Sequence, residues 1–92
     1  QAWDVVNDEV QEALERVLSG KASPLLYFLK KNIMTTSMVA SYVGNISLVV
    51  RLHCHPYFFK RLSTKMLAKY AYTFRITVEE LTDIDRLKKH DR

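Results

Sequence analysis

The sequence predicts an all-α fold in a single small domain. Only two Gly and two Pro occur in 92 residues, which leaves little room for long irregular loops and favours helices. Apolar residues recur at helical spacing, and Ser or Thr residues that can cap helices stand before several of these runs. With 48% apolar and 26% charged residues, the composition is that of an ordinary globular domain with one core.

Residues 3–18 are expected to form an N-terminal amphipathic helix, which ends at Ser19-Gly20 with Gly20 at the C′ position. The apolar seam of this helix repeats at alternating three- and four-residue steps. Two heptads are too few for a coiled coil, so this segment, residues 1–20, either docks on its own domain or forms a homodimer contact. The seam consists of Trp3, Val6, Val10, Ala13 and Val17.

A second helix begins with clear signals, since Ser23 can cap it and Pro24 takes the first helical position. A third helix follows, capped by Thr35 or Thr36. It is expected to end at Gly44 with a positive φ angle.

Residues 46–54 fit two structures. Apolar and polar residues alternate there, which is the period of a strand and would give an α+β fold with a hairpin at 35–54. The alternative is a helix after the glycine turn. The small Ala40 would let it cross the preceding helix closely, as in a helix-turn-helix. We favour the helix because of the segments that follow.

The last third of the chain is expected to hold two more helices. After an aromatic-basic connection at 57–61, Ser63 can cap a helix that buries Leu67, Tyr70, Ala71 and Phe74. Thr77 and Glu80 form a capping box that opens a final helix. This helix is expected to turn Leu81, Ile84 and Leu87 inward, before a polar tail at 88–92.

The charges are distributed very unevenly along the chain. Between Arg16 and Val78 there is no Asp or Glu, although ten Lys or Arg residues occur, so a net charge of +4 hides a strongly positive middle. Phosphate groups are the usual neutralising partner of such a surface, which indicates nucleic-acid binding. A solvated surface with the acids displaced to the two ends is the alternative.

Other functional classes find little support in the sequence. His53, Cys54 and His55 stand together, but zinc needs three or four ligands and no second cluster is near, so neither a metal nor another cofactor is expected. The middle of the chain lacks a carboxylate to orient a catalytic histidine, so the protein is not expected to be an enzyme. No apolar run is long enough to span a membrane. Of the aromatic residues, Tyr57 and Tyr72 lie beside basic residues and could contact a nucleic-acid backbone or unstacked bases.

The pattern Thr64-x-x-Leu67-x-x-Tyr70-Ala71-x-x-Phe74-x-Ile76-Thr77-x-x-Glu80-Leu81 resembles the second half of the lambda-repressor-like (Cro/CI, Xre) helix-turn-helix family. The element Val39-Ala40-x-x-Val43-Gly44 is similar to the second helix of that family and its turn. The resemblance extends from Pro24 to Ile84. It implies a five-helix domain at residues 21–87, preceded by the extra N-terminal amphipathic helix.

The resemblance also implies a function, namely sequence-selective binding of double-stranded DNA by a transcriptional regulator, with helix 46–54 in the major groove. The protein would then be a cytoplasmic, nucleoid-associated protein of a bacterium or phage, and not secreted; the single Cys54 fits a reducing compartment. By position, Thr36 and Ser37 would hold a phosphate, and a further set would follow the DNA backbone. The base edges would face Ser47, Leu48, Val49, Arg51 and Leu52, and the backbone would face His55, Lys60 and Arg61.

This sequence departs from the family where the base-reading residues are expected. Leu48, Val49 and Leu52 stand where polar side chains are usual, and Asn45 and His53 stand where apolar ones are. Apolar residues can contact thymine methyl groups, but they hydrogen-bond no base. A second hypothesis is therefore a protein-interaction module of the same fold, with Leu48, Val49 and Leu52 as an apolar contact surface.

Overall fold

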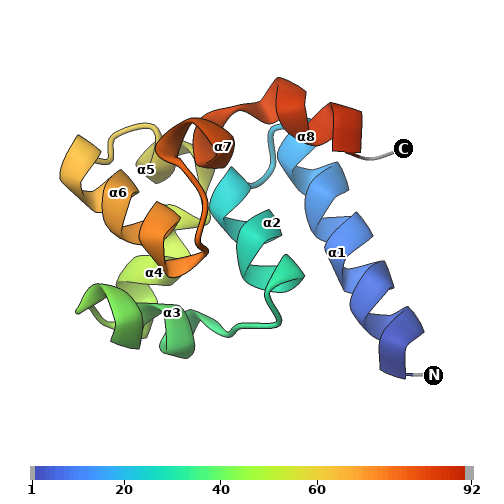
Figure 1. The fold of residues 1–92 in the computed structure, drawn as a ribbon, viewed down its shortest axis with the longest axis horizontal. Coiled ribbons are helices and arrows are strands. Elements are labelled where there is room, and N and C mark those ends of the chain that lie inside the picture. The colour runs from blue at the N-terminus through green and yellow to red at the C-terminus, as the bar shows by residue number, and fades with distance from the viewer. Residues whose placement is uncertain (1, 91–92) are drawn as a thin grey trace.

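The chain folds into eight α-helices in the part that the structure describes (Figure 1). The structure is a computed structural model, which describes the backbone of residues 2–90 and the side chains of residues 7–87. No strand occurs within residues 2–90, so the all-α prediction is confirmed and the α+β alternative with a hairpin at 35–54 is wrong. The helices are α1 (Ala2–Leu18), α2 (Pro24–Lys31), α3 (Thr36–Val43), α4 (Ser47–His53), α5 (Pro56–Phe59), α6 (Thr64–Thr73), α7 (Val78–Thr82) and α8 (Ile84–His90).

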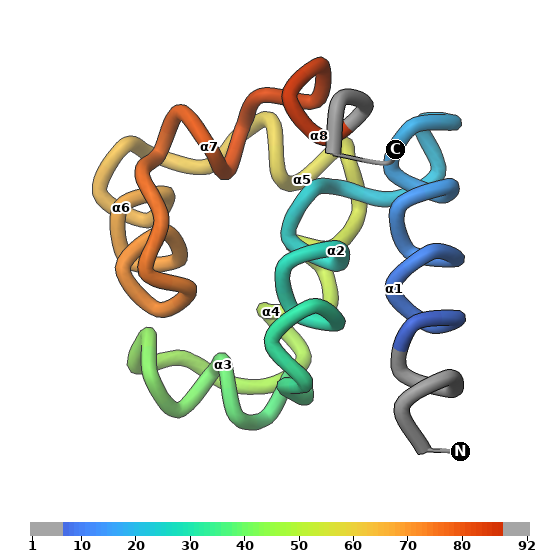
Figure 2. Tube along the Cα trace, turned by 45° about the vertical axis from the view of Figure 1, so that its right-hand side comes forward, coloured from blue at the N-terminus to red at the C-terminus, as the bar shows by residue number. Residues whose placement is uncertain are grey.

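Helix α2 stands at the centre of the molecule, with α1 on one side and α3, α4 and α6 on the other (Figures 1 and 2). The core forms around it because each neighbouring helix contributes at least one side chain that is withdrawn from water. Phe28 of α2 stacks on Phe74 with ring centroids 6.0 Å apart. The most completely buried apolar side chains include Leu14, Leu25, Val39, Val50, Tyr70 and Leu81.

Helix α1 docks on its own domain, where it packs against α2 and α8. Ala13 and Val17 of the predicted seam are 3% and 2% exposed, and Val10 is half-buried. Leu14 is as buried as Val17, although it lies outside that seam. Because this docking buries Ala13 and Val17, they are not available for a homodimer contact. The side chains of Trp3 and Val6 lie outside the described residues.

The turn between α3 and α4 has the geometry that the sequence predicts. The Thr35 hydroxyl accepts a hydrogen bond from Met38 N–H at 3.1 Å and so caps α3. Gly44 has a φ of 73°, in the left-handed region that glycine adopts without strain. Helix α4 then begins at Ser47 and packs on α3. The helical alternative for residues 46–54 is thus confirmed.

The prediction that the Ser23 side chain caps α2 is wrong. Its hydroxyl does not cap α2 but donates a hydrogen bond of 2.7 Å to the carbonyl oxygen of His53. The backbone N–H of Ser23 donates to the carbonyl oxygen of Cys54, also at 2.7 Å. Ser23 is 1% exposed, so these two bonds fasten the connection between α1 and α2 to the C-terminal end of α4. They also satisfy carbonyl groups that the end of a helix leaves without partners.

Seven helices follow α1, where five were expected, because two connections differ from the prediction. The aromatic-basic connection contains the short helix α5, with Pro56 at its first position. The expected final helix is interrupted at Asp83, whose carboxylate accepts a hydrogen bond from Arg86 N–H at 3.1 Å. Ile84 is consequently 40% exposed rather than inward, whereas Leu81 and Leu87 are buried as predicted. Residues 88–90, expected in a polar tail, belong to α8.

Besides α3, three helices are followed by a left-handed residue, in the Schellman arrangement. Gly20 takes this position after α1, Ile33 after α2 and Arg75 after α6, with φ angles of 82°, 54° and 58°. After α2, Ile33 N–H donates to the Lys30 carbonyl and Met34 N–H to the Leu29 carbonyl, at 3.1 and 3.0 Å. A β-branched side chain is strained in this region, so Ile33 costs the fold stability.

Replacing Ile33 by glycine is expected to stabilise the fold by about 1 kcal/mol, because glycine adopts this φ angle without steric strain. Ile33 is 66% exposed, so little burial is lost. Urea unfolding followed by circular dichroism measures the change. Ile33→Val keeps the β-branch and serves as the control, and should not be stabilised. If the glycine variant were less stable than the parent, the assigned strain would be refuted.

Candidate nucleic-acid interface

The residues expected to meet DNA lie on the first turn of α3, on α4, and on the two segments that flank α5. Two of them are directly joined, since the hydroxyl oxygens of Thr36 and Ser47 are 2.9 Å apart and share a hydrogen bond. Helix α4 packs on both α3 and α5, which links the three segments in space. Ser37 is exposed beside Thr36, in the first turn of α3, where backbone N–H groups lack partners within the helix.

The outward side of α4 is mainly apolar. Leu48 and Leu52, one turn apart, are 58% and 42% exposed, and Arg51 is exposed between them in the sequence. Val49 is only half-buried, and Val50 is fully within the core. Helix α4 therefore presents two leucines and one guanidinium to the solvent, with the Ser47 hydroxyl at its first turn.

The ring of His55 is exposed and also forms contacts within the fold. Its Nδ1 accepts a hydrogen bond from Tyr57 N–H at 3.3 Å and caps α5, and its ring meets Phe58 edge-on. The Arg61 guanidinium lies over the ring of Tyr57, 4.5 Å from the centroid. This cation occupies one face of Tyr57, which leaves that ring less available for a base. Lys60 is exposed.

The cations of the acid-free segment remain unpaired among the described residues. Nine of its ten Lys and Arg side chains are exposed, and Lys30 is half-buried. The described ion pair joins Arg86 to Glu80 at 4.0 Å, outside this segment. No described carboxylate forms an ion pair with these cations, so the middle of the chain has a positive surface.

His53 connects the end of α4 to α6. Its Nδ1 is 2.6 Å from the Tyr70 hydroxyl oxygen, and the two rings meet edge-on. Desolvation by burial lowers the pKa of His53 and raises the pKa of Tyr70. The neutral imidazole is therefore favoured, and its Nδ1 and the Tyr70 hydroxyl share one hydrogen bond.

We expect the stability of the fold to fall as the pH decreases below about 6.5, the ordinary pKa of histidine. Below this pH the unfolded chain binds a proton at His53 that the folded chain resists, so stability is fully present only above it. Chemical unfolding at several pH values from about 8 to about 5, a range that spans this pKa, measures the loss of stability. The loss should be smaller in His53→Gln, and an unchanged loss in that variant would contradict the assignment.

The Cys54 thiol, at the end of α4, is unreactive. Burial raises the pKa of the Cys54 thiol to about 11, so the thiol stays protonated and is a poor nucleophile. The described side chains form no group of three or more residues that could hold a metal ion. Within the described part of the chain, each helix is too short or too polar to cross a lipid bilayer.

The fold also assembles a second basic surface that the sequence analysis missed. An open groove between α3 and α6 brings Tyr42 and Arg75 together with Lys65, Lys69 and Tyr72. The last three share one side of α6 and could be grouped from helical spacing. Tyr42 and Arg75 could not be grouped with them, because their proximity depends on how α3 packs on α6.

Comparisons with protein-family models, with curated proteins and with solved structures found no significant match to this chain.

Proposed function

We propose that the protein binds double-stranded DNA sequence-selectively, as a transcriptional regulator, with α4 in the major groove. The observation that carries the proposal is the set of exposed cations without described carboxylate partners on either side of α4. Two short helices joined by a glycine turn, with the second one exposed along one side, support the same conclusion.

Each segment of the interface has a distinct role in this proposal. The first-turn N–H groups of Thr36 and Ser37 bind a phosphate, while Lys60 and Arg61 bind the backbone farther along. Arg51 hydrogen-bonds a base edge, which is the contact that distinguishes sequences. Leu48 and Leu52 pack against thymine methyl groups, and Ser47 adds a hydroxyl at the start of the helix. Half-buried Val49 contributes less than the two leucines.

Fluorescence anisotropy with a randomised duplex library, followed by selection of the bound sequences, tests this proposal. Binding should weaken steeply as salt increases, because counterions are released from each neutralised phosphate. Lys60→Ala should weaken all sequences alike and reduce the salt slope by about one. Arg86→Ala removes the same charge from α8 and is the control. Duplex binding that stays undetectable at low salt would refute the proposal.

A second candidate function is protein binding through the apolar side of α4, and the exposure of Leu48 and Leu52 favours it. The substitution Leu48→Lys separates the two functions. In random duplexes the added cation should maintain or raise the affinity at low salt, because it adds positive charge close to the DNA polyanion, although the selected sequence loses its thymine contact. In an apolar protein contact it would place a charge in the centre and abolish binding.

A further inference from the structure

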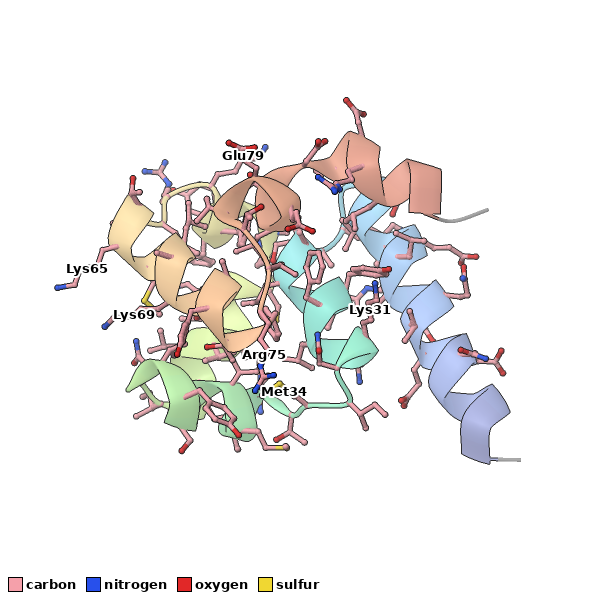
Figure 3. All side chains as sticks on the ribbon, viewed as in Figure 1. Lys31, Met34, Lys65, Lys69, Arg75 and Glu79 are labelled. Atoms are coloured by element: carbon pink, nitrogen blue, oxygen red, sulfur yellow. The ribbon has the colours of Figure 1, made fainter. Side chains whose placement is uncertain are left out.

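A groove opens between α6 and the C-terminal half of α3. Figure 3 shows Lys65 and Lys69 projecting from α6, and it labels Arg75 and Met34, which also line the groove. No residue of α4 lines this groove, so it is separate from the proposed duplex-binding side. Its principal lining residues are Tyr42, Lys65, Lys69, Tyr72, Arg75 and Ile76.

The charge of the groove is entirely positive. Lys65, Lys69 and Arg75 line it together, and no Asp or Glu does. All three are exposed, and none forms an ion pair with a described carboxylate. Lys65 and Lys69 are one helical turn apart, about 6 Å along the axis. A row of cations with this spacing suits a chain of phosphates.

Two tyrosines in this groove are unlike the other tyrosines of the described chain. Tyr42 and Tyr72 are 72% and 76% exposed, and neither ring has a hydrogen bond or ring contact with a described residue. By contrast, Tyr27 lies against Phe28, Tyr57 against Arg61 and Tyr70 against His53. The groove thus holds two aromatic faces that the fold itself does not use.

The backbone at Arg75 adds an independent observation. Arg75 occupies the left-handed C′ position with a φ of 58°, where α1 has Gly20. An arginine there costs stability that a glycine would not, as Ile33 does after α2. The Arg75 side chain is one of the three cations that line the groove.

We propose that this groove binds single-stranded nucleic acid, with bases stacked on Tyr42 and Tyr72 and phosphates on Lys65, Lys69 and Arg75. Exposed aromatic rings beside unpaired cations are the pattern of single-strand binding, because every unpaired base has a face that can stack. Paired bases in a duplex offer no such face at the level of the phosphates. An acidic peptide would match the cations but leave both tyrosines without partners. The site is additional to the duplex site on α4 and does not depend on it.

Fluorescence anisotropy of a labelled oligothymidine with the full chain tests the proposal. Tyr42→Ala and Tyr72→Ala should each weaken binding roughly 5- to 100-fold, the range measured for loss of one stacked base. Tyr72→Phe keeps the ring and should bind like the parent. Lys69→Gln should weaken binding and reduce the salt slope by about 0.7. Arg75→Gly should bind more weakly although it unfolds at higher urea, a combination that a purely structural role would not give.

Two comparisons separate this site from the proposed duplex site. Arg51→Ala should weaken duplex binding and leave oligothymidine binding unchanged. Tyr42→Ala and Tyr72→Ala should weaken oligothymidine binding and leave duplex binding unchanged. Loss of duplex and single-strand binding together in the tyrosine variants would overturn the inference. Equal binding of poly-glutamate, competing with oligothymidine, would also overturn it, since the groove would then recognise charge alone. Parent-like binding by both alanine variants would do the same.

Discussion

Replacing Arg51 by alanine is expected to weaken binding of the selected duplex by about 1–3 kcal/mol and to blur the base preference, under the function proposed above. Arg51 is the exposed cation of α4, and its guanidinium can donate two hydrogen bonds to a guanine edge. The affinity for random duplexes should decrease much less, because for them the variant loses only the electrostatic attraction between Arg51 and nearby phosphates. Titrations of both duplexes by anisotropy give the two affinities.

Arg51→Lys is the matched variant for this prediction. It keeps the charge but loses the planar fork, so non-specific affinity and salt slope should be retained while the base preference weakens. A selected site that bound Arg51→Ala as tightly as the parent would show that α4 does not read bases through this residue.

Replacing Leu25 by alanine is expected to lower the free energy of unfolding by about 2–5 kcal/mol, the range for a buried leucine that leaves a cavity. Leu25 is 0% exposed, and its helix α2 packs against α1 and α7. This loss is a large share of the roughly 5–15 kcal/mol that stabilises a typical domain. The midpoint of thermal unfolding should decrease by about 4–8 °C for each kcal/mol lost.

The neighbouring Leu26→Ala is the control, because the chemical change is the same and only the burial differs. Leu26 is half-buried at the edge of the core, so its loss should be clearly smaller. Equal losses for the two variants, measured by urea unfolding, would mean that α2 is not the centre of the core.

The sequence predicted the helices most reliably where a cap and an apolar face agreed. Thr77 and Glu80 form the expected capping box, and Ser63 caps α6 as expected. Residues 46–54 were ambiguous because their apolar residues alternate. In the structure, Ile46, Leu48 and Leu52 are exposed and Val50 is buried, so the alternation does not correspond to two faces of a strand.

The errors have local causes that propensity alone does not decide. Ser23 has the residue type and position of a cap, but its hydroxyl finds a carbonyl acceptor thirty residues away. Asp83 could equally continue a helix or begin one, and its carboxylate in fact accepts from Arg86 N–H. Burial of Ile84 was expected from the spacing of one continuous helix, and the break at Asp83 rotates it outward.

The two candidate sites differ in how much a sequence can reveal. The interface on α4 follows from order along the chain, since Ser47, Arg51 and Leu52 share one short helix. The groove between α3 and α6 joins Tyr42 to residues more than twenty positions farther along the chain, and the sequence pattern does not reveal that proximity. The spacing of Lys65, Lys69 and Tyr72 on α6 was visible in the sequence, and the addition of Tyr42 and Arg75 was not.

The two hydrogen bonds that Ser23 donates couple the linker between α1 and α2 mechanically to α4. If α1 and the linker that follows it moved away, the His53 and Cys54 carbonyl oxygens would lose the hydrogen bonds that Ser23 donates to them. The C-terminal end of α4 would then no longer be held in place by Ser23. Movement of α1 would therefore weaken the position of α4, on the other side of α2. The Ser23 amide should consequently exchange its hydrogen as slowly as amides at the centre of the protein, despite its place in a connecting loop.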